Sequence, residues 1–109
     1  MISIALSYGK NCAIKCKANG HANFSKKGED IVCSAVTVLL RTAAEVLSHT
    51  ENVSLIFSAP GRGNLSFEAS AKSESDKTHL QIECIGDFLR TGLKALTKEF
   101  PENVVFTEE

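Results

Sequence analysis

Apolar and polar residues alternate along four short stretches of the chain, residues 2–8, 12–18, 53–57 and 65–71. Because successive side chains of a β-strand point to opposite faces, this alternation predicts strands with one buried face. Gly9 and Lys10 separate the first two stretches, and the segment APGRGN separates the second two. Both linkers contain residues that favour tight turns. The pattern therefore predicts two β-hairpins.

A different period, with apolar residues every three or four positions, predicts two helices over about 31–49 and 79–99. Asp30 suits the N-cap of the first helix, since its carboxylate can accept the unpaired amide hydrogens of the first turn. Pro101 ends the second helix, and residues 104–107 suit a short last strand. The expected buried stripes are Val32, Ala35 or Val36, Leu39, Ala43 and Val46, and then Ile82, Ile85, Leu89, Leu93 and Leu96.

The resulting order, ββαββαβ, predicts an α+β fold in which a mainly antiparallel sheet has both helices packed on one face. A chain of 109 residues suits one domain over residues 1–109. Lys and Arg total 12 against 13 Asp and Glu, so the net charge is −1. This balance argues against nucleic-acid binding driven by overall charge. No segment approaches the roughly 18 apolar residues of a membrane helix, and no secretory signal is evident. We therefore expect a cytoplasmic protein with no membrane or direct nucleic-acid partner.

The four cysteines are expected to be reduced in that compartment. On one strand, Cys12 and Cys16 would lie about 13 Å apart, too far for a disulfide. Their C-x-x-x-C spacing is also a poor zinc signature without a second ligand pair. Cys12, Cys16 and Cys84 are accordingly expected to be small buried apolar side chains, and no cofactor is expected.

Cys33 differs because it would be the third residue of the first helix. The partial positive charge of a helix N-terminus stabilises a nearby thiolate and can make a cysteine nucleophilic. His21 precedes it by twelve residues, within reach of a loop that folds back, and could accept the thiol proton. From spacing alone, however, a core cysteine and a loop histidine are the more common interpretation.

A longer motif changes that balance. Gly20-His21-Ala22, five residues, and then GEDIVCSAVT over 28–37 resemble the signature of the ribosomal-processing cysteine protease family called Prp. The signature reads G-H-A, a variable loop and G-x-D-[IV]-[VI]-C-[AS]-A-[VI]-[ST], and each defined position matches. The predicted element order and the Phe100-Pro101 step before a last strand also fit this family.

The resemblance implies a bacterial cysteine protease that removes an N-terminal extension from large-subunit ribosomal protein number twenty-seven. It also implies a homodimer and a catalytic dyad, carried here by Cys33 and His21. Acyl transfer through a thioester would follow, with backbone amides at the helix start, including that of Cys33, as oxyanion donors. No third residue that orients His21 is evident from the sequence.

Supporting roles are expected at Gly20, Ser34 and Thr37, the last two because they share the helix of Cys33. Asp30 could orient His21 or hold substrate, but we favour its role as N-cap. The segment 23–28 is expected to be mobile and to become ordered over a bound peptide.

Two other functions fit some of the same residues. A metal-binding module could use His21, Asp30 and Cys33, although three ligands of mixed hardness without a second histidine make a weak set. A non-catalytic ribosome-associated binding protein is the main alternative, although the sequence lacks the motifs of common RNA-binding modules.

Overall fold

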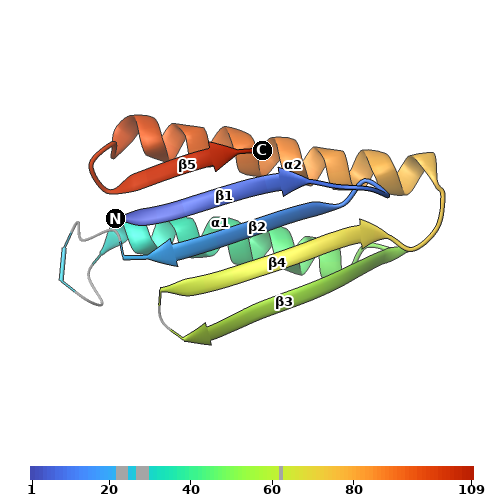
Figure 1. Cartoon of the computed structure of the whole chain (residues 1–109), viewed down its shortest axis with the longest axis horizontal. Coiled ribbons are helices and arrows are strands. Elements are labelled where there is room, and N and C mark those ends of the chain that lie inside the picture. Colours follow the sequence, from blue (N-terminus) through green and yellow to red (C-terminus); the bar gives the residue numbers. More distant parts are fainter. Residues whose placement is uncertain (22–24, 27–29, 62) are drawn as a thin grey trace.

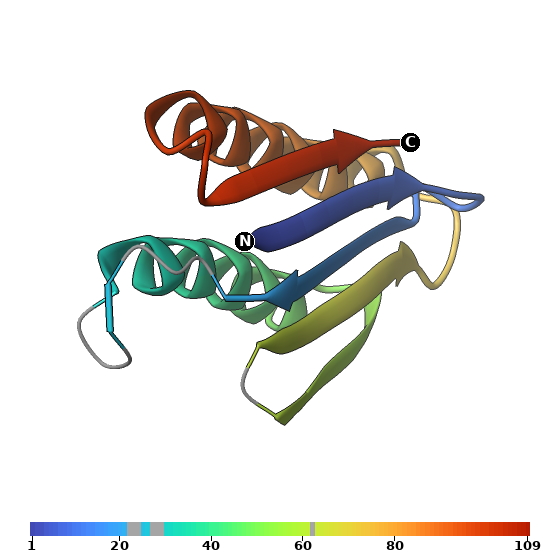
Figure 2. The same cartoon turned by 60° about the vertical axis from the view of Figure 1, so that its left-hand side comes forward.

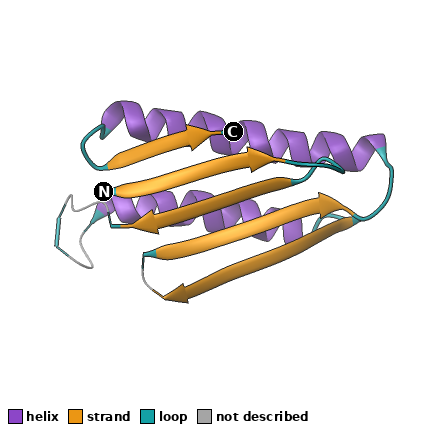
Figure 3. Ribbon diagram, in the orientation of Figure 1, coloured by secondary structure: helices purple, strands orange, loops and turns teal. Residues whose placement is uncertain are grey.

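A five-stranded sheet with two helices on one face forms the structure, a computed structural model (Figure 1, Figure 3). The structure describes residues 1–21, 25–26, 30–61 and 63–109. Its elements are β1 (Ile2–Tyr8), β2 (Ile14–Gly20), α1 (Ile31–Ser48), β3 (Val53–Gly61), β4 (Asn64–Ala71), α2 (Asp76–Glu99) and β5 (Val104–Glu108). The predicted α+β class and the order ββαββαβ are confirmed.

The strand order in the sheet is β3-β4-β2-β1-β5. Three neighbouring pairs are antiparallel, and β5 alone runs parallel to its neighbour β1. The parallel pairing arises because the chain returns through α2 on the face of the sheet, as a crossover connection requires. Turning the molecule shows both helices on the same side of the sheet (Figure 2). The sheet is thus mixed but mainly antiparallel, as predicted.

The core lies between that sheet face and the two helices. Alternate residues of the central strands are buried there, and the helices contribute their sheet-facing stripes. In α1 the buried residues are Val32, Val36, Leu40, Ala43, Ala44 and Leu47, and in α2 they are Thr78, Ile82, Gly86, Leu89 and Leu93. The predicted Val46 is instead exposed. Its neighbour Leu47 is buried in its place, because the buried side of the last turns of α1 passes through Ala43, Ala44 and Leu47.

The start of α2 differs from the prediction by three residues. The helix begins at Asp76, and the hydroxyl of Ser75 caps it by accepting a 3.3 Å hydrogen bond from the amide of Thr78. Asn52 supports this end of the helix through hydrogen bonds to Ser73 and Thr78. Residues 72–78 were predicted to be a loop because they are polar. Ser75, within that segment, is an ordinary N-capping residue, so the helix begins earlier than predicted.

The first hairpin turns two residues later than predicted. Its turn joins Lys10 to Ala13 by a 3.1 Å backbone hydrogen bond, with positive φ at both Asn11 (59°) and Cys12 (55°). Positive φ at both central positions is the pattern of a type I′ turn, which suits the twist of a hairpin. Cys12 therefore lies in a turn rather than on a strand, so the strand-based distance to Cys16 does not apply.

The burial predicted for the other cysteines is correct at one position only. Cys16 is buried, Cys12 is half-buried and Cys84 is exposed on α2. All four cysteines are free thiols in this structure. Cys84 was misplaced because a single cysteine on an amphipathic helix does not reveal which face it occupies.

Helix α1 also corrects an expectation about membranes. It is the one helix among the described residues that is long and apolar enough to cross a membrane, with a mean hydropathy of 1.6 over 18 residues. The prediction that no segment approached this length was therefore wrong. Length and composition are weak evidence for a span, because core helices have the same character. Here six apolar residues of α1, from Val32 to Leu47, pack into the core, whereas Ile31, Val38 and Val46 are exposed.

Candidate active site

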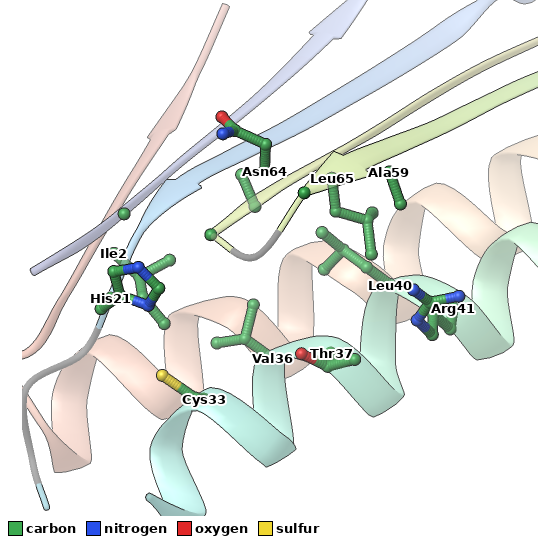
Figure 4. A pocket seen from close by; sticks show the side chains of 14 residues that line it. Ile2, His21, Cys33, Val36, Thr37, Leu40, Arg41, Ala59, Asn64 and Leu65 are labelled. Carbon is green, nitrogen blue, oxygen red and sulfur yellow. The ribbon is translucent and has the colours of Figure 1, made fainter. Parts of the chain in front are cut away.

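A cavity of about 330 Å³ lies between the first half of α1 and the ends of β2, β3 and β4 (Figure 4). It is lined by Ile2, Ala18, Gly20, His21, Cys33, Val36, Thr37, Leu40, Arg41, Ala59, Gly61, Gly63, Asn64 and Leu65. The structure thus brings the predicted pair, His21 and Cys33, to the same cavity. The two lie at one end of it, and Arg41 lies at the other (Figure 4).

Cys33 is placed by the first turn of α1. The carboxylate of Asp30 caps this turn, since its Oδ1 accepts 3.0 Å hydrogen bonds from the amides of both Val32 and Cys33. Its Oδ2 accepts a 3.4 Å hydrogen bond from the amide of Ser25. The Cys33 side chain is half-buried, and its sulfur points from the helix toward the imidazole of His21 (Figure 4). The predicted N-cap is confirmed.

The cap has a consequence for the oxyanion donors expected from the sequence. The Cys33 amide already donates to Asp30, and the next amide, that of Ser34, donates to the Asp30 carbonyl at 3.1 Å. An oxyanion would share these amide hydrogens with Asp30, as in the three-centre hydrogen bonds common at helix ends. The oxyanion role expected for the Cys33 amide stays a prediction.

His21 follows β2 directly, and its position depends on Gly20. Gly20 has a φ of +97°, which side chains disfavour, and a Cβ there would lie 2.3 Å from the carbonyl oxygen of Met1. The Gly20 amide donates a 2.8 Å hydrogen bond to the carbonyl of Gly63. Gly20 is therefore needed for the chain to leave the sheet at this point and present His21 to the cavity.

Gly63 provides the space that the imidazole occupies. Its φ is +80°, and a Cβ there would lie 2.9 Å from Nε2 and 3.0 Å from Cε1 of His21. These distances are shorter than ordinary van der Waals contacts, so any side chain at Gly63 would displace the ring. From the sequence, the glycines of APGRGN indicated a turn and nothing more. The contact of Gly63 with His21 depends on the pairing of β2 with β4, which no local motif reveals.

The other predicted site residues divide into two groups. Both Thr37 and Ser34 are exposed, but only Thr37, one turn after Cys33, lines the cavity. Arg41 and Asn64 also line the cavity and were not predicted. Much of segment 23–28, expected to order over a peptide, lies outside the described residues. Within the described ranges, no three His, Cys, Asp or Glu side chains are grouped as metal ligands.

Cys16 and Cys12 lie outside this cavity and differ from Cys33 in their surroundings. Burial raises the pKa of the Cys16 thiol to about 12, so this side chain is neutral at physiological pH. Burial, with a smaller contribution from Glu83, also raises the pKa of Cys12. These two thiols thus have the character of packing residues and not of nucleophiles.

Comparisons with known proteins agree with this fold. A protease described as an essential ribosomal processing protease Prp from S. aureus, with a covalently linked product peptide, superposes with a TM-score of 0.76 at 17% identity over 100% of both chains. The same protein with a substrate peptide gives a TM-score of 0.74 at 15% identity, again over 100% of both chains. SMU.848 from Streptococcus mutans gives 0.73 at 20% identity, covering 99% of this chain and 93% of that one.

At these identities the structural likeness shows a shared fold. A search of curated proteins found no match. The sequence itself matches the family model for cysteine protease Prp over residues 1–105, nearly the whole chain. The chain therefore belongs to the cysteine protease Prp family.

Proposed function

We propose that this protein is a cysteine endopeptidase with Cys33 as nucleophile and His21 as general base and acid. The observation that carries the proposal is that these two residues, twelve positions apart, meet at one end of a single cavity. The half-buried sulfur at the start of α1 has the helix N-terminus behind it, which favours negative charge. The exposed imidazole opposite it can exchange protons with solvent and substrate.

The reaction is acyl transfer to sulfur and then to water. His21 accepts the Cys33 proton as the sulfur attacks the scissile carbonyl carbon, and the imidazolium then protonates the departing amine. The peptide C–N bond breaks and a thioester remains on Cys33. A water molecule, deprotonated by His21, hydrolyses the thioester, which releases a carboxylic acid and restores the thiol.

For the substrate, we propose the precursor of bacterial large-subunit ribosomal protein number twenty-seven, cleaved after its N-terminal extension in the cytoplasm. The family of the chain and the peptide complexes of the S. aureus protease support a peptide substrate of this kind. The lining of the cavity is mainly apolar with a few polar groups.

The decisive experiment compares purified variants on such a precursor. Cys33→Ala and His21→Ala should each lose cleavage, while Cys84→Ala, which removes an exposed thiol on α2, should keep it. Mass spectrometry of the products identifies the cleaved bond. Cleavage by the Cys33→Ala protein at the wild-type rate would refute the assignment of the nucleophile.

We further propose a homodimer. Leu80, Cys84 and Phe88 are four residues apart on α2 and exposed, so they form an apolar stripe on the outer side of the helix. Such a stripe is typical of surfaces that contact a partner. Light scattering after size exclusion should give twice the 11.7 kDa of one chain. A monomeric mass at micromolar concentration would argue against the dimer.

A further inference from the structure

A second hollow lies further along α1 from the candidate active site. Its volume is about 540 Å³, and it is lined by Arg41, Thr42, Ala44, Glu45, Val46, Ser48, Leu55 and Phe57. Arg41 lines both this hollow and the cavity of Cys33, so the two adjoin at that residue. We call the second hollow the distal groove.

The distal groove lies between α1 and the part of β3 that the helix covers only partly. Val53, Leu55 and Phe57 share the helix-facing side of the strand, since side chains alternate along it. Val53 is 8% exposed, Leu55 is half-buried and Phe57 is 38% exposed. The solvent exposure of these side chains therefore increases along β3 toward the active site. The floor of the groove is therefore apolar, although it is open to solvent.

The groove also has an open strand edge beside it. Within the described sheet, β3 pairs with β4 on one side and with no strand on the other. The outer edge of such a strand can hydrogen-bond to an extended peptide, whose alternate side chains then enter neighbouring pockets. Side-chain pockets and a strand edge are the two features that this mode of recognition needs.

The length of the groove can be expressed in substrate residues. Arg41 follows Cys33 by eight positions and Ser48 by fifteen, which corresponds to about 12 Å and about 22 Å along a helix. An extended peptide covers about 3.3 Å per residue. Arg41 and Phe57 therefore lie about four residues from the scissile bond, and the far end of the groove about seven.

We propose that the distal groove binds the part of the substrate on one side of the scissile bond. It selects an apolar side chain about four residues from that bond. This inference rests on the proposed function. Phe57 forms the floor of that subsite. The Arg41 guanidinium lies 5.4 Å from the Phe57 ring centroid and forms its wall toward Cys33. Because the site is remote from Cys33, it contributes binding to the substrate without taking part in bond cleavage.

The test compares Phe57→Ala with Ile56→Ala. Ile56 is the adjacent residue on β3, is 66% exposed and lies on the opposite face of the strand, so it controls for changes in the strand itself. Each variant is assayed on peptides that extend two residues on both sides of the scissile bond, and on peptides lengthened to seven residues on one side or the other. Phe57→Ala should lower kcat/KM for one of the two long series by about tenfold to a hundredfold, mainly through KM. It should leave the short peptide unaffected, as should Ile56→Ala with all peptides.

A binding measurement separates this inference from the proposed chemistry. In the Cys33→Ala background, fluorescence anisotropy of the long peptide should show the same weakening on addition of Phe57→Ala, whether or not the wild type cleaves that peptide. Equal affinity with Phe57 and with alanine would overturn the inference and leave the assignment of Cys33 and His21 intact. Loss of cleavage in Phe57→Ala for the short peptide as well would also overturn it, since the groove would then act on the catalytic end of the cavity.

Discussion

Replacing Gly63 with alanine tests how the position of His21 is maintained. The new Cβ would lie 2.9 Å from Nε2, whereas ordinary contact begins at 3.4 Å, so the imidazole must move by about 0.5 Å, the difference of the two distances. Misplacing a catalytic group by 1 Å can reduce turnover about a hundredfold. We therefore expect Gly63→Ala to lower kcat/KM by about tenfold to a hundredfold.

The same substitution should have a smaller effect on stability. A residue with a side chain at a φ of +80° costs about 1–2 kcal/mol relative to glycine. The clash with His21 adds little, because the exposed ring can rotate away without disturbing packed atoms. Urea unfolding and peptide cleavage on the same preparation would show both effects. The activity should fall further than a destabilised but folded enzyme can explain.

Gly61→Ala is the matched control. Gly61 belongs to the same turn and lines the same cavity, but a Cβ there meets no atom within 4 Å. This variant should retain both activity and stability. If Gly63→Ala kept the wild-type kcat/KM, or if Gly61→Ala lost as much, the argument that Gly63 provides space for His21 would be refuted.

Three further predictions concern the surroundings of the pair. Asp30→Asn should keep stability and most cleavage because Asn also caps helices, whereas thermal melts of Asp30→Ala should show a loss of stability of about 1 kcal/mol. A stable but inactive Asp30→Asn would show a catalytic role for the carboxylate. Brief alkylation at pH 7 should modify Cys33 first, exposed Cys84 more slowly, and buried Cys16, whose pKa is raised to about 12, hardly at all, as mass spectrometry would show. Faster labelling of Cys84 would contradict an activated Cys33. Gly20→Ala should unfold at lower urea and lose cleavage, because its Cβ would lie 2.3 Å from the Met1 carbonyl; wild-type behaviour would contradict the close approach.

The fold was predictable because its signals are local. Alternation and helical periodicity each depend on residues within one element, and Asp30 caps amides two and three residues away. The first turn was predicted two residues early because Asn11 and Cys12 adopt positive φ, and cysteine gives no hint of this conformation. When a turn includes a residue that rarely adopts positive φ, as Cys12 does here, the sequence pattern misplaces the turn.

The site was predictable in part, for the same reason. His21 and Cys33 belong to one short motif, but Gly63 and Arg41 join them only through the pairing of strands and the packing of α1 on the sheet. Gly63 is 42 positions from His21 along the chain. A glycine in a turn and an arginine on the polar side of a helix have ordinary local explanations. Their place in the site follows only from the three-dimensional structure.

The open edge of β3 also bears on how the protein avoids edge-to-edge aggregation. A long, flat strand edge offers a template on which another copy of the same sheet can add and begin aggregation. Here the register of β3 against β4 shifts between Ser58 and Gly61, and Pro60 within that interval lacks an N–H. The irregularity limits the regular edge to about six residues, from Val53 to Ser58, and interrupts it at the end of β3. Replacing Pro60 with a β-branched residue would extend that edge and make the enzyme prone to aggregate.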